Sequence, residues 1–122
     1  MTQPPPNLFV DFVLEEDGLY LHFANASCGE AYEVSVSFSQ PLLGFNRSRD
    51  LSKLRLFQHL TYMAPHKAFM IYIDDVSLFL KTLKETTIRI TIEYQDAEKK
   101  AFKKEITHNL AIYQDLPIIL KP

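Results

Sequence analysis

The stretch Ala31-Tyr32-Glu33-Val34-Ser35-Val36-Ser37-Phe38 has an apolar residue at every second position from Tyr32 onward. Successive side chains of a β-strand point to opposite faces, so this pattern predicts a strand with one buried and one wet face. The residues expected in the core are Tyr32, Val34, Val36 and Phe38, and those expected in water are Glu33, Ser35 and Ser37. Strands that are wet on one face are typical of antiparallel sheets, because parallel strands are buried on both faces. We therefore expect an antiparallel, all-β domain.

The same alternation recurs on both sides of this stretch. It covers residues 8–14, 19–24, 68–73, 88–94 and 101–110. Polar turns separate the first of these segments from the second and the fourth from the fifth, so each of these two pairs is predicted to form a hairpin. About seven short strands with polar turns between them predict an immunoglobulin-like antiparallel β-sandwich with Greek-key connections.

One segment has helical rather than strand periodicity. Over residues 76–84 the apolar residues recur at i, i+3, i+4 and i+7, as Val76, Phe79, Leu80 and Leu83. Asp74 and Asp75 precede the segment and supply a helix N-cap with favourable charge. A helix this short is not stable alone, so we expect a crossover helix at about residues 76–84 that docks on the sandwich.

A lysine interrupts the apolar face of the last predicted strand. Phe102, Ile106 and Leu110 share one face of residues 101–110, and Lys104 shares it too. An inward-pointing lysine protects an exposed sheet edge, whereas a β-bulge would turn the side chain away. We favour an edge strand.

Composition is that of an ordinary globular domain. The chain has 122 residues, 47% of them hydrophobic and 23% charged, and its formal net charge is -2. This slight negative charge disfavours nucleic-acid binding, and no apolar run is long enough to span a membrane. We expect a single domain over residues 8–122 after a Pro-rich tail or linker at residues 1–7. Those seven residues do not resemble a signal peptide, so the default expectation is a cytoplasmic protein, with a periplasmic or extracellular location open if the chain is an excerpt.

Residues 19–38 combine a strand, a turn with asparagine and glycine, and a second strand. The residues that mark this pattern are Asn25, Gly29, Ala31, Val34 and Val36. The pattern resembles the second and third strands of bacterial immunoglobulin-like accessory domains of the CARDB type. The turn Met63-Ala64-Pro65-His66 is similar to that family's apolar-x-Pro-Gly turn, with His66 where glycine is usual. Such domains are mostly spacers or binding modules, so the resemblance implies a role without catalytic residues.

Motifs for catalysis, cofactors and metals are missing from the sequence. The three glycines are too far apart to cradle a phosphate, and the four histidines show none of the common zinc spacings. We therefore predict no catalytic, cofactor-binding or metal-binding residues. Cys28 needs a nearby histidine to act as a nucleophile, and His22 is the candidate across the hairpin. A free thiol in a turn is the simpler interpretation.

Two charged clusters have simple structural explanations. The runs Glu15-Glu16-Asp17 and Asp74-Asp75 can hold calcium only if loops join them, whereas a solvated turn and a helix N-cap explain them directly. The basic cluster consists of Lys99, Lys100, Lys103 and Lys104. Its lysines are predicted on both faces of a hairpin, which is typical of an aggregation-resistant edge rather than of a nucleic-acid or lipid contact.

These patterns predict a non-enzymatic protein-interaction or structural module. Its partner is expected to be another protein or a neighbouring domain, bound through a sheet face or an edge strand, and an edge strand also allows a homo-oligomer. The long connection over residues 39–56 is the expected contact surface, with Phe45, Arg47 and Arg49 as candidate residues.

Two alternatives stay open. One is a small ligand-binding or hydrolytic β domain whose site forms only in three dimensions, in a deep pocket with His22, Cys28 or His108. The other is the soluble domain of a membrane-anchored protein, with Pro4 to Pro6 as the hinge.

Overall fold

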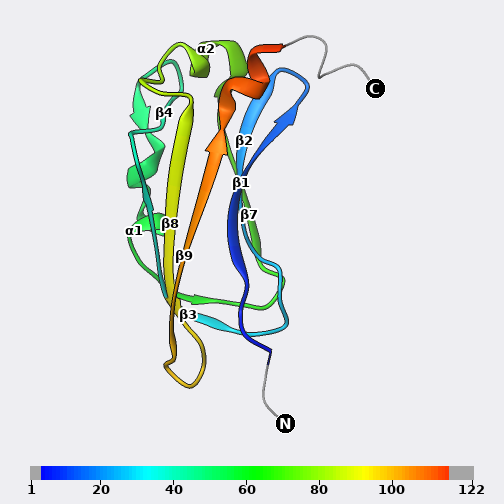
Figure 1. Cartoon of the computed structure of the whole chain (residues 1–122), viewed down its shortest axis with the longest axis vertical. Coiled ribbons are helices and arrows are strands. Elements are labelled where there is room, and N and C mark those ends of the chain that lie inside the picture. Colours follow the sequence, from blue (N-terminus) through cyan, green and yellow to red (C-terminus); the bar gives the residue numbers. More distant parts are fainter. Residues whose placement is uncertain (1–3, 116–122) are drawn as a thin grey trace.

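Two antiparallel sheets face each other and form the body of the molecule (Figure 1). The computed structural model describes residues 4–115. One sheet has the order β1-β2-β7, with β1 (Leu8–Glu15), β2 (Gly18–Asn25) and β7 (Ala68–Asp75). The other has the order β6-β3-β8-β9, with β6 (Leu60–Met63), β3 (Ala31–Phe38), β8 (Thr87–Gln95) and β9 (Ala101–Asn109). The predicted all-β antiparallel sandwich is confirmed, with seven strands in these two sheets over the described residues.

Short elements fill the connections. The strands β4 (Leu43–Gly44) and β5 (Arg49–Asp50) form a small hairpin of their own, followed by the 3₁₀ helix η1 (Leu51–Lys53) and by α1 (Arg55–Gln58). The helix α2 (Val76–Leu80) joins β7 to β8, and the 3₁₀ helix η2 (Leu110–Asp115) follows β9. The sequence pattern did not predict α1. The apolar sequence of residues 116–120 predicts a segment that packs back on the domain, but these residues lie outside the described part of the chain.

The core lies between the two sheets. Its strand residues include Leu8, Val10, Phe12, Leu19, Leu21, Phe23, Val34, Val36, Ile88, Ile90 and Ile92, all from inward positions. Phe57 of α1 is fully buried, and its ring centroid lies 5.6 Å from that of Phe23 and 5.1 Å from that of Phe38. One turn of helix in the long connection thus supplies a central aromatic ring to the core.

A β-bulge breaks the alternation of β3. Between Tyr32 and Ser35 the register with β8 shifts, because Tyr32 pairs with Gln95 and Ser35 with Glu93. Glu33 has a φ of 52°, in the left-handed region. The extra residue turns the start of the strand over, so Ala31 is buried whereas Tyr32 is only half-buried. The prediction that Tyr32 faces the core is therefore corrected by the bulge.

The helix after β7 is shorter than the predicted 76–84. Asp75 caps α2, since its carboxylate accepts from the amides of Ser77 at 2.9 Å and Leu78 at 3.4 Å. The helix ends at Leu80, and Thr82 then donates both its amide and its hydroxyl to the carbonyl of Phe79. This local bonding tightens the last turn and stops the helix.

The free edge of β1 is closed by side chains from the other end of the chain. Lys104 donates to the carbonyl of Leu8 at 3.0 Å, His108 Nε2 lies 2.8 Å from that of Val10, and Tyr113 donates to that of Phe12 at 3.2 Å. The register of β8 with β9 has no shift, and β9 is an edge strand. The prediction of an edge strand with an inward lysine is confirmed, and the bulge alternative is not needed.

The described part of the predicted tail lies against the domain. Pro6 is buried, and Ser27 Oγ donates to the carbonyl of Pro5 at 2.7 Å. A Cβ at Gly29 would lie 2.2 Å from the carbonyl oxygen of Pro4. Glycine at position 29 is what allows residues 4–6 to approach the turn so closely.

Candidate functional site

The outward positions of the three-stranded sheet are mostly apolar and aromatic. On β1, β2 and β7 they include Phe9, Val13, Tyr20, Met70 and Tyr72, next to Asp11 and His22. Met70 is 50% exposed and Tyr72 is 40% exposed, and the rings of Tyr20 and Tyr72 lie edge to face, 5.4 Å apart. The outward positions of the four-stranded sheet are instead mostly polar, for example Ser35, Ser37, Thr91, Glu93, Lys103 and Glu105.

The turn between β4 and β5 has an unusual backbone. Phe45, Asn46 and Arg47 have φ values of 52°, 56° and 68°, so three successive residues without glycine are left-handed. Two bonds hold them: the amide of Phe45 donates to the carbonyl of Ile73 at 3.0 Å, and that of Asn46 to the buried carboxylate of Asp74 at 2.7 Å. Strained backbone that its surroundings hold in place is concentrated at functional sites.

This turn presents Phe45 beside the sheet. The side chain is 47% exposed, and its ring lies edge to face with Tyr72 at a centroid distance of 5.9 Å. Phe45 therefore extends the row of exposed aromatic side chains beyond β7. We call Phe9, Val13, Tyr20, Met70, Tyr72 and Phe45 the aromatic face.

An acidic hollow adjoins the aromatic face at the β1–β2 turn. It has a volume of about 280 Å³ and is lined by Glu15, Glu16, Asp17, Gly18, Tyr20, Tyr72 and Asp75. A Cβ at Gly18 would lie 3.3 Å from both tyrosine rings, so glycine leaves room for the rings to lean over the turn. Burial raises the pKa of Tyr72 above 10.0, and the negative charges of Asp74 and Asp75 raise it further.

The three predicted contact residues lie in different surroundings. Phe45 belongs to the aromatic face. Arg47 points toward α2, where its guanidinium lies 3.5 Å from the carbonyl of Lys81, and Arg49 is exposed on β5. Phe45 and Arg47 are only two residues apart, but the strained turn between them places their side chains in different surroundings.

Cys28 lies next to His66 and not next to His22, the histidine suggested by the sequence. Its Sγ lies 3.4 Å from Nε2 of His66, while His22 packs edge to face on Phe9 at 5.2 Å. His66 has a φ of 60°, in the left-handed region that glycine adopts without steric cost. Four surface hollows within residues 4–115 are lined by none of His22, Cys28 and His108. The ligand-binding or hydrolytic alternative stays a prediction.

The acidic runs were also considered as metal ligands in the sequence. Among the described residues, no group of three or more His, Cys, Asp or Glu side chains is arranged to hold a metal ion. Nor is any helix of this part of the chain long and apolar enough to cross a membrane. Lys104 bonds to β1, and the ammonium of Lys100 lies 5.5 Å from the ring centroid of Phe102.

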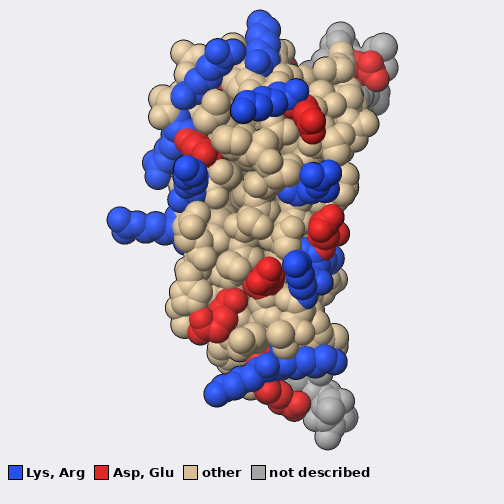
Figure 2. Space-filling view, turned by 60° about the vertical axis from the view of Figure 1, so that its left-hand side comes forward, with Lys and Arg blue, Asp and Glu red and all other residues tan. Residues whose placement is uncertain are grey.

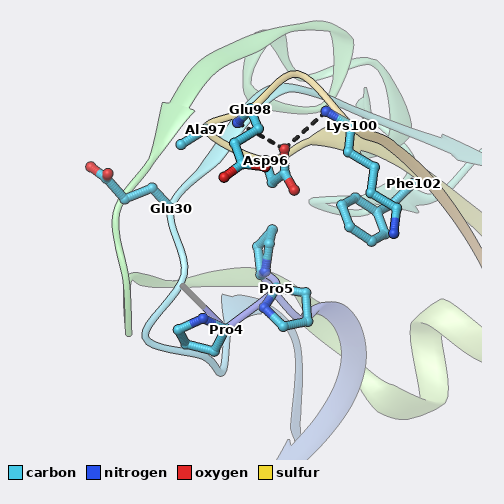
Figure 3. A pocket seen from close by; sticks show the side chains of 9 residues that line it. Pro4, Pro5, Glu30, Asp96, Ala97, Glu98, Lys100 and Phe102 are labelled. Carbon is cyan, nitrogen blue, oxygen red and sulfur yellow. Dashed lines mark hydrogen bonds between the residues drawn. The ribbon is translucent and has the colours of Figure 1, made fainter. Parts of the chain in front are cut away.

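A second hollow, of about 300 Å³, lies between the N-terminal prolines and the β8–β9 turn (Figure 3). Asp96 holds this turn by accepting from the amides of Glu98 and Lys100, both at 2.9 Å, while Glu30 points away from the prolines. One wall is formed by Pro4, the first residue that the structure describes.

The aromatic face is visible in the sequence once the strands are aligned. Phe9, Tyr20, Met70 and Tyr72 occupy outward positions that carry polar residues in residues 31–38. The sequence predicts the long connection and not these residues as the contact surface, because alternation alone does not tell which of two apolar faces is buried.

Comparison with known proteins gives little beyond a family. No curated protein matches the chain. Two crystal structures of wild-type OgpA from Akkermansia muciniphila are similar at 16% sequence identity, with TM-scores of 0.38 and 0.39. The alignments cover 90% of this chain but only 28% and 30% of the OgpA chain, so this chain spans less than a third of it. A family model described as "Domain of unknown function (DUF8453)" matches residues 1–114, and the chain belongs to that family.

Proposed function

We propose that this domain is a non-enzymatic protein-interaction module that binds its partner through the aromatic face. The observation that carries the proposal is the exposure of Phe45, Met70 and Tyr72 together on one side of the sandwich. Contiguous apolar surface rimmed by polar residues is typical of interaction sites, and single scattered apolar residues are not. Aromatic and methionine side chains are also the ones enriched at such interfaces.

The finer fold assignment belongs to the same proposal. We propose an immunoglobulin-like topology because the order β1-β2-β7 against β6-β3-β8-β9 corresponds to strands A-B-E against C′-C-F-G. Folds of this kind support many functions, so the topology by itself names no partner. The CARDB-type resemblance stays a prediction.

Affinity capture with matched variants tests the binding role. The double variant Met70→Ser/Tyr72→Ser removes the centre of the aromatic face. The control Tyr62→Ser/Ile112→Ser removes side chains that are 43% and 52% exposed, almost the same as the 40% of Tyr72 and 50% of Met70, from β6 and η2. Each immobilised chain is incubated with a lysate of the encoding organism, and bound proteins are quantified by mass spectrometry.

The expected result is a set of proteins retained by the wild type and the control but lost from the Met70/Tyr72 variant. Equal retention by all three chains, or no retention above bare resin, would contradict the proposal. Circular dichroism and thermal melting establish that both variants are folded before the capture is interpreted.

A further inference from the structure

The four outer edges of the three-stranded and four-stranded sheets differ in how they are protected. Backbone groups at an exposed edge pair readily with another strand, and proteins block this with side-chain bonds, lysines or very short edge strands. The edge of β1 has its carbonyls bonded by Lys104, His108 and Tyr113. The edge strand β9 and the turn before it carry four lysines, and β6 has only four residues. β7 has eight residues and no lysine or arginine.

The direction of the free backbone groups of β7 follows from its pairing with β2. The amide of Asn25 donates to the carbonyl of Lys67, which is opposite it in the β2–β7 register. Bonded and non-bonded pairs alternate between antiparallel strands. Ala68, Met70 and Tyr72 therefore direct their N–H and C=O groups away from β2, and their side chains are all exposed.

The β4–β5 turn ends this free edge. Phe45 donates its amide to the carbonyl of Ile73, immediately after Tyr72. An added strand can thus pair along residues 68–72 and stop against the ring of Phe45. Its alternate side chains would lie beside Met70 and Tyr72 on the aromatic face.

Charge indicates what such a strand carries. The three strands of this sheet contain Asp11, Glu15, Asp74 and Asp75 but no lysine or arginine. On the side of the molecule that carries α1 and β8 in Figure 1, Lys and Arg are instead interspersed with Asp and Glu (Figure 2). Within residues 4–115, moreover, no carboxylate forms a salt bridge with lysine or arginine, since both ion pairs involve histidine.

We propose that β7 accepts an extended segment of a partner protein as an additional strand over residues 68–72. The side chains of this segment that share the face of Met70 and Tyr72 are apolar beside Met70 and a lysine or arginine beside Tyr72. The inference rests on the proposed binding function and specifies the partner's chemistry. Main-chain hydrogen bonds to β7 supply affinity, and a basic side chain next to Tyr72 reaches the acidic hollow. A second copy of this chain fits less well, because two such sheets would bring like charges together.

Selection of peptides on the whole chain tests this directly. The probe is a phage library of random dodecapeptides, selected on the immobilised wild-type protein, and the affinity of each enriched peptide is then measured by biolayer interferometry. Met70→Pro removes one outward amide of β7 without removing a bond to β2. Thr107→Pro is the matched control, because it also removes an outward amide from an edge strand. The amide of Leu110 donates to the carbonyl of Thr86, and bonded and non-bonded pairs alternate along β8 and β9. The amide of Thr107 therefore points away from β8.

Enriched peptides are expected to be apolar and basic, and to bind Met70→Pro about tenfold or more weakly than wild type while binding Thr107→Pro equally well. Methylation of alternate peptide nitrogens should weaken binding to the unchanged protein by a similar factor. Replacing the basic residues of the peptide by glutamate should also abolish binding.

The proposal would be overturned if no peptide is enriched or if the enriched peptides are acidic. It would also be overturned if Met70→Pro binds the peptides as tightly as wild type does and the methylated peptides bind as tightly as the unmethylated ones. Sedimentation velocity addresses the other occupant: a wild-type dimer that Met70→Pro dissociates would assign the edge to a second copy. If Met70→Ser/Tyr72→Ser loses its captured proteins but Met70→Pro keeps them, strand addition fails while binding through the aromatic face stands.

Discussion

Replacing Asn25 by alanine removes a buried amide that joins three segments of the chain. The side chain is at the end of β2 and is only 1% exposed. Its Nδ2 donates to the carbonyls of Gly29 at 2.8 Å and Ala64 at 3.3 Å, and its Oδ1 accepts from the amides of Asn7 at 3.3 Å and Ser27 at 3.2 Å. The N-terminal segment, the turn at residues 26–30 and the turn before β7 thus share one side chain.

The expected loss of stability follows from what the variant leaves unpaired. The bond to the carbonyl of Gly29 is buried, and losing the partner of a buried group costs about 1–3 kcal/mol. The other three bonds are partly buried, so water replaces the lost partner in part. The loss of each of these bonds costs about 0.5 kcal/mol. The sum is about 2.5–4.5 kcal/mol, which lowers the melting temperature of a chain of this length by about 10–18 °C.

Urea unfolding monitored by far-UV circular dichroism measures this loss of stability, with Asn109→Ala as the control. Asn109 is exposed, and within residues 4–115 its Oδ1 accepts a hydrogen bond only from the amide of Ala111, so its replacement should cost about 0.5 kcal/mol. A loss below about 1 kcal/mol for Asn25→Ala, or equal losses for the two variants, would refute the reasoning.

Three further predictions concern separate parts of the structure. Lys104→Met removes the bonds to Leu8 and the N-terminal segment and should lower the unfolding free energy by about 1–2 kcal/mol in urea titrations, with faster amide exchange in β1. Asp74→Ala releases the amide of Asn46 and should make trypsin cleave after Arg47 faster, with a stability loss of about 1–3 kcal/mol. Burial raises the pKa of Tyr94 above 10.0, although a backbone hydrogen bond lowers it in part, so stability should fall as pH rises beyond about 10, because the unfolded chain ionises first. Tyr94→Phe should reduce this fall in melting temperature.

Each of these has an outcome that contradicts it. Lys103→Met changes a lysine on the exposed face of the same strand, and an equal effect of both lysine variants would show that charge and not the bonds to β1 matters. Unchanged trypsin cleavage in Asp74→Ala would mean that the turn holds its left-handed backbone without the carboxylate. An identical alkaline profile for wild type and Tyr94→Phe would assign the pH dependence to other groups.

The strands were predictable because their alternation is a local property of the sequence. The bulge at Glu33 was not predictable, because neither a glycine nor a break in the alternation marks it. The register with β8 imposes the bulge. The α1 helix is one turn long and is stabilised by burial of Phe57, a tertiary effect that periodicity does not show.

The candidate site was predictable in part. Phe45 was identified from its place in a long connection, but its left-handed backbone depends on contacts with Ile73 and Asp74, which lie almost thirty residues away. The residues of the sheet edge are apparent in residues 68–73, yet their role depends on which strand lies at the edge. Strand order is set by the assembled sheets and not by any single segment.

The bonds that close the edge of β1 also set an order in time. Lys104, His108 and Tyr113 are 96 to 101 positions after the carbonyls that they bind. At translation rates of about 5–20 residues per second, the ribosome needs roughly 5–20 s to make the intervening chain. During that interval the outer carbonyls of β1 lack these three partners, so a nascent chain is open to pairing with its neighbours on a polysome until β9 and η2 are synthesised.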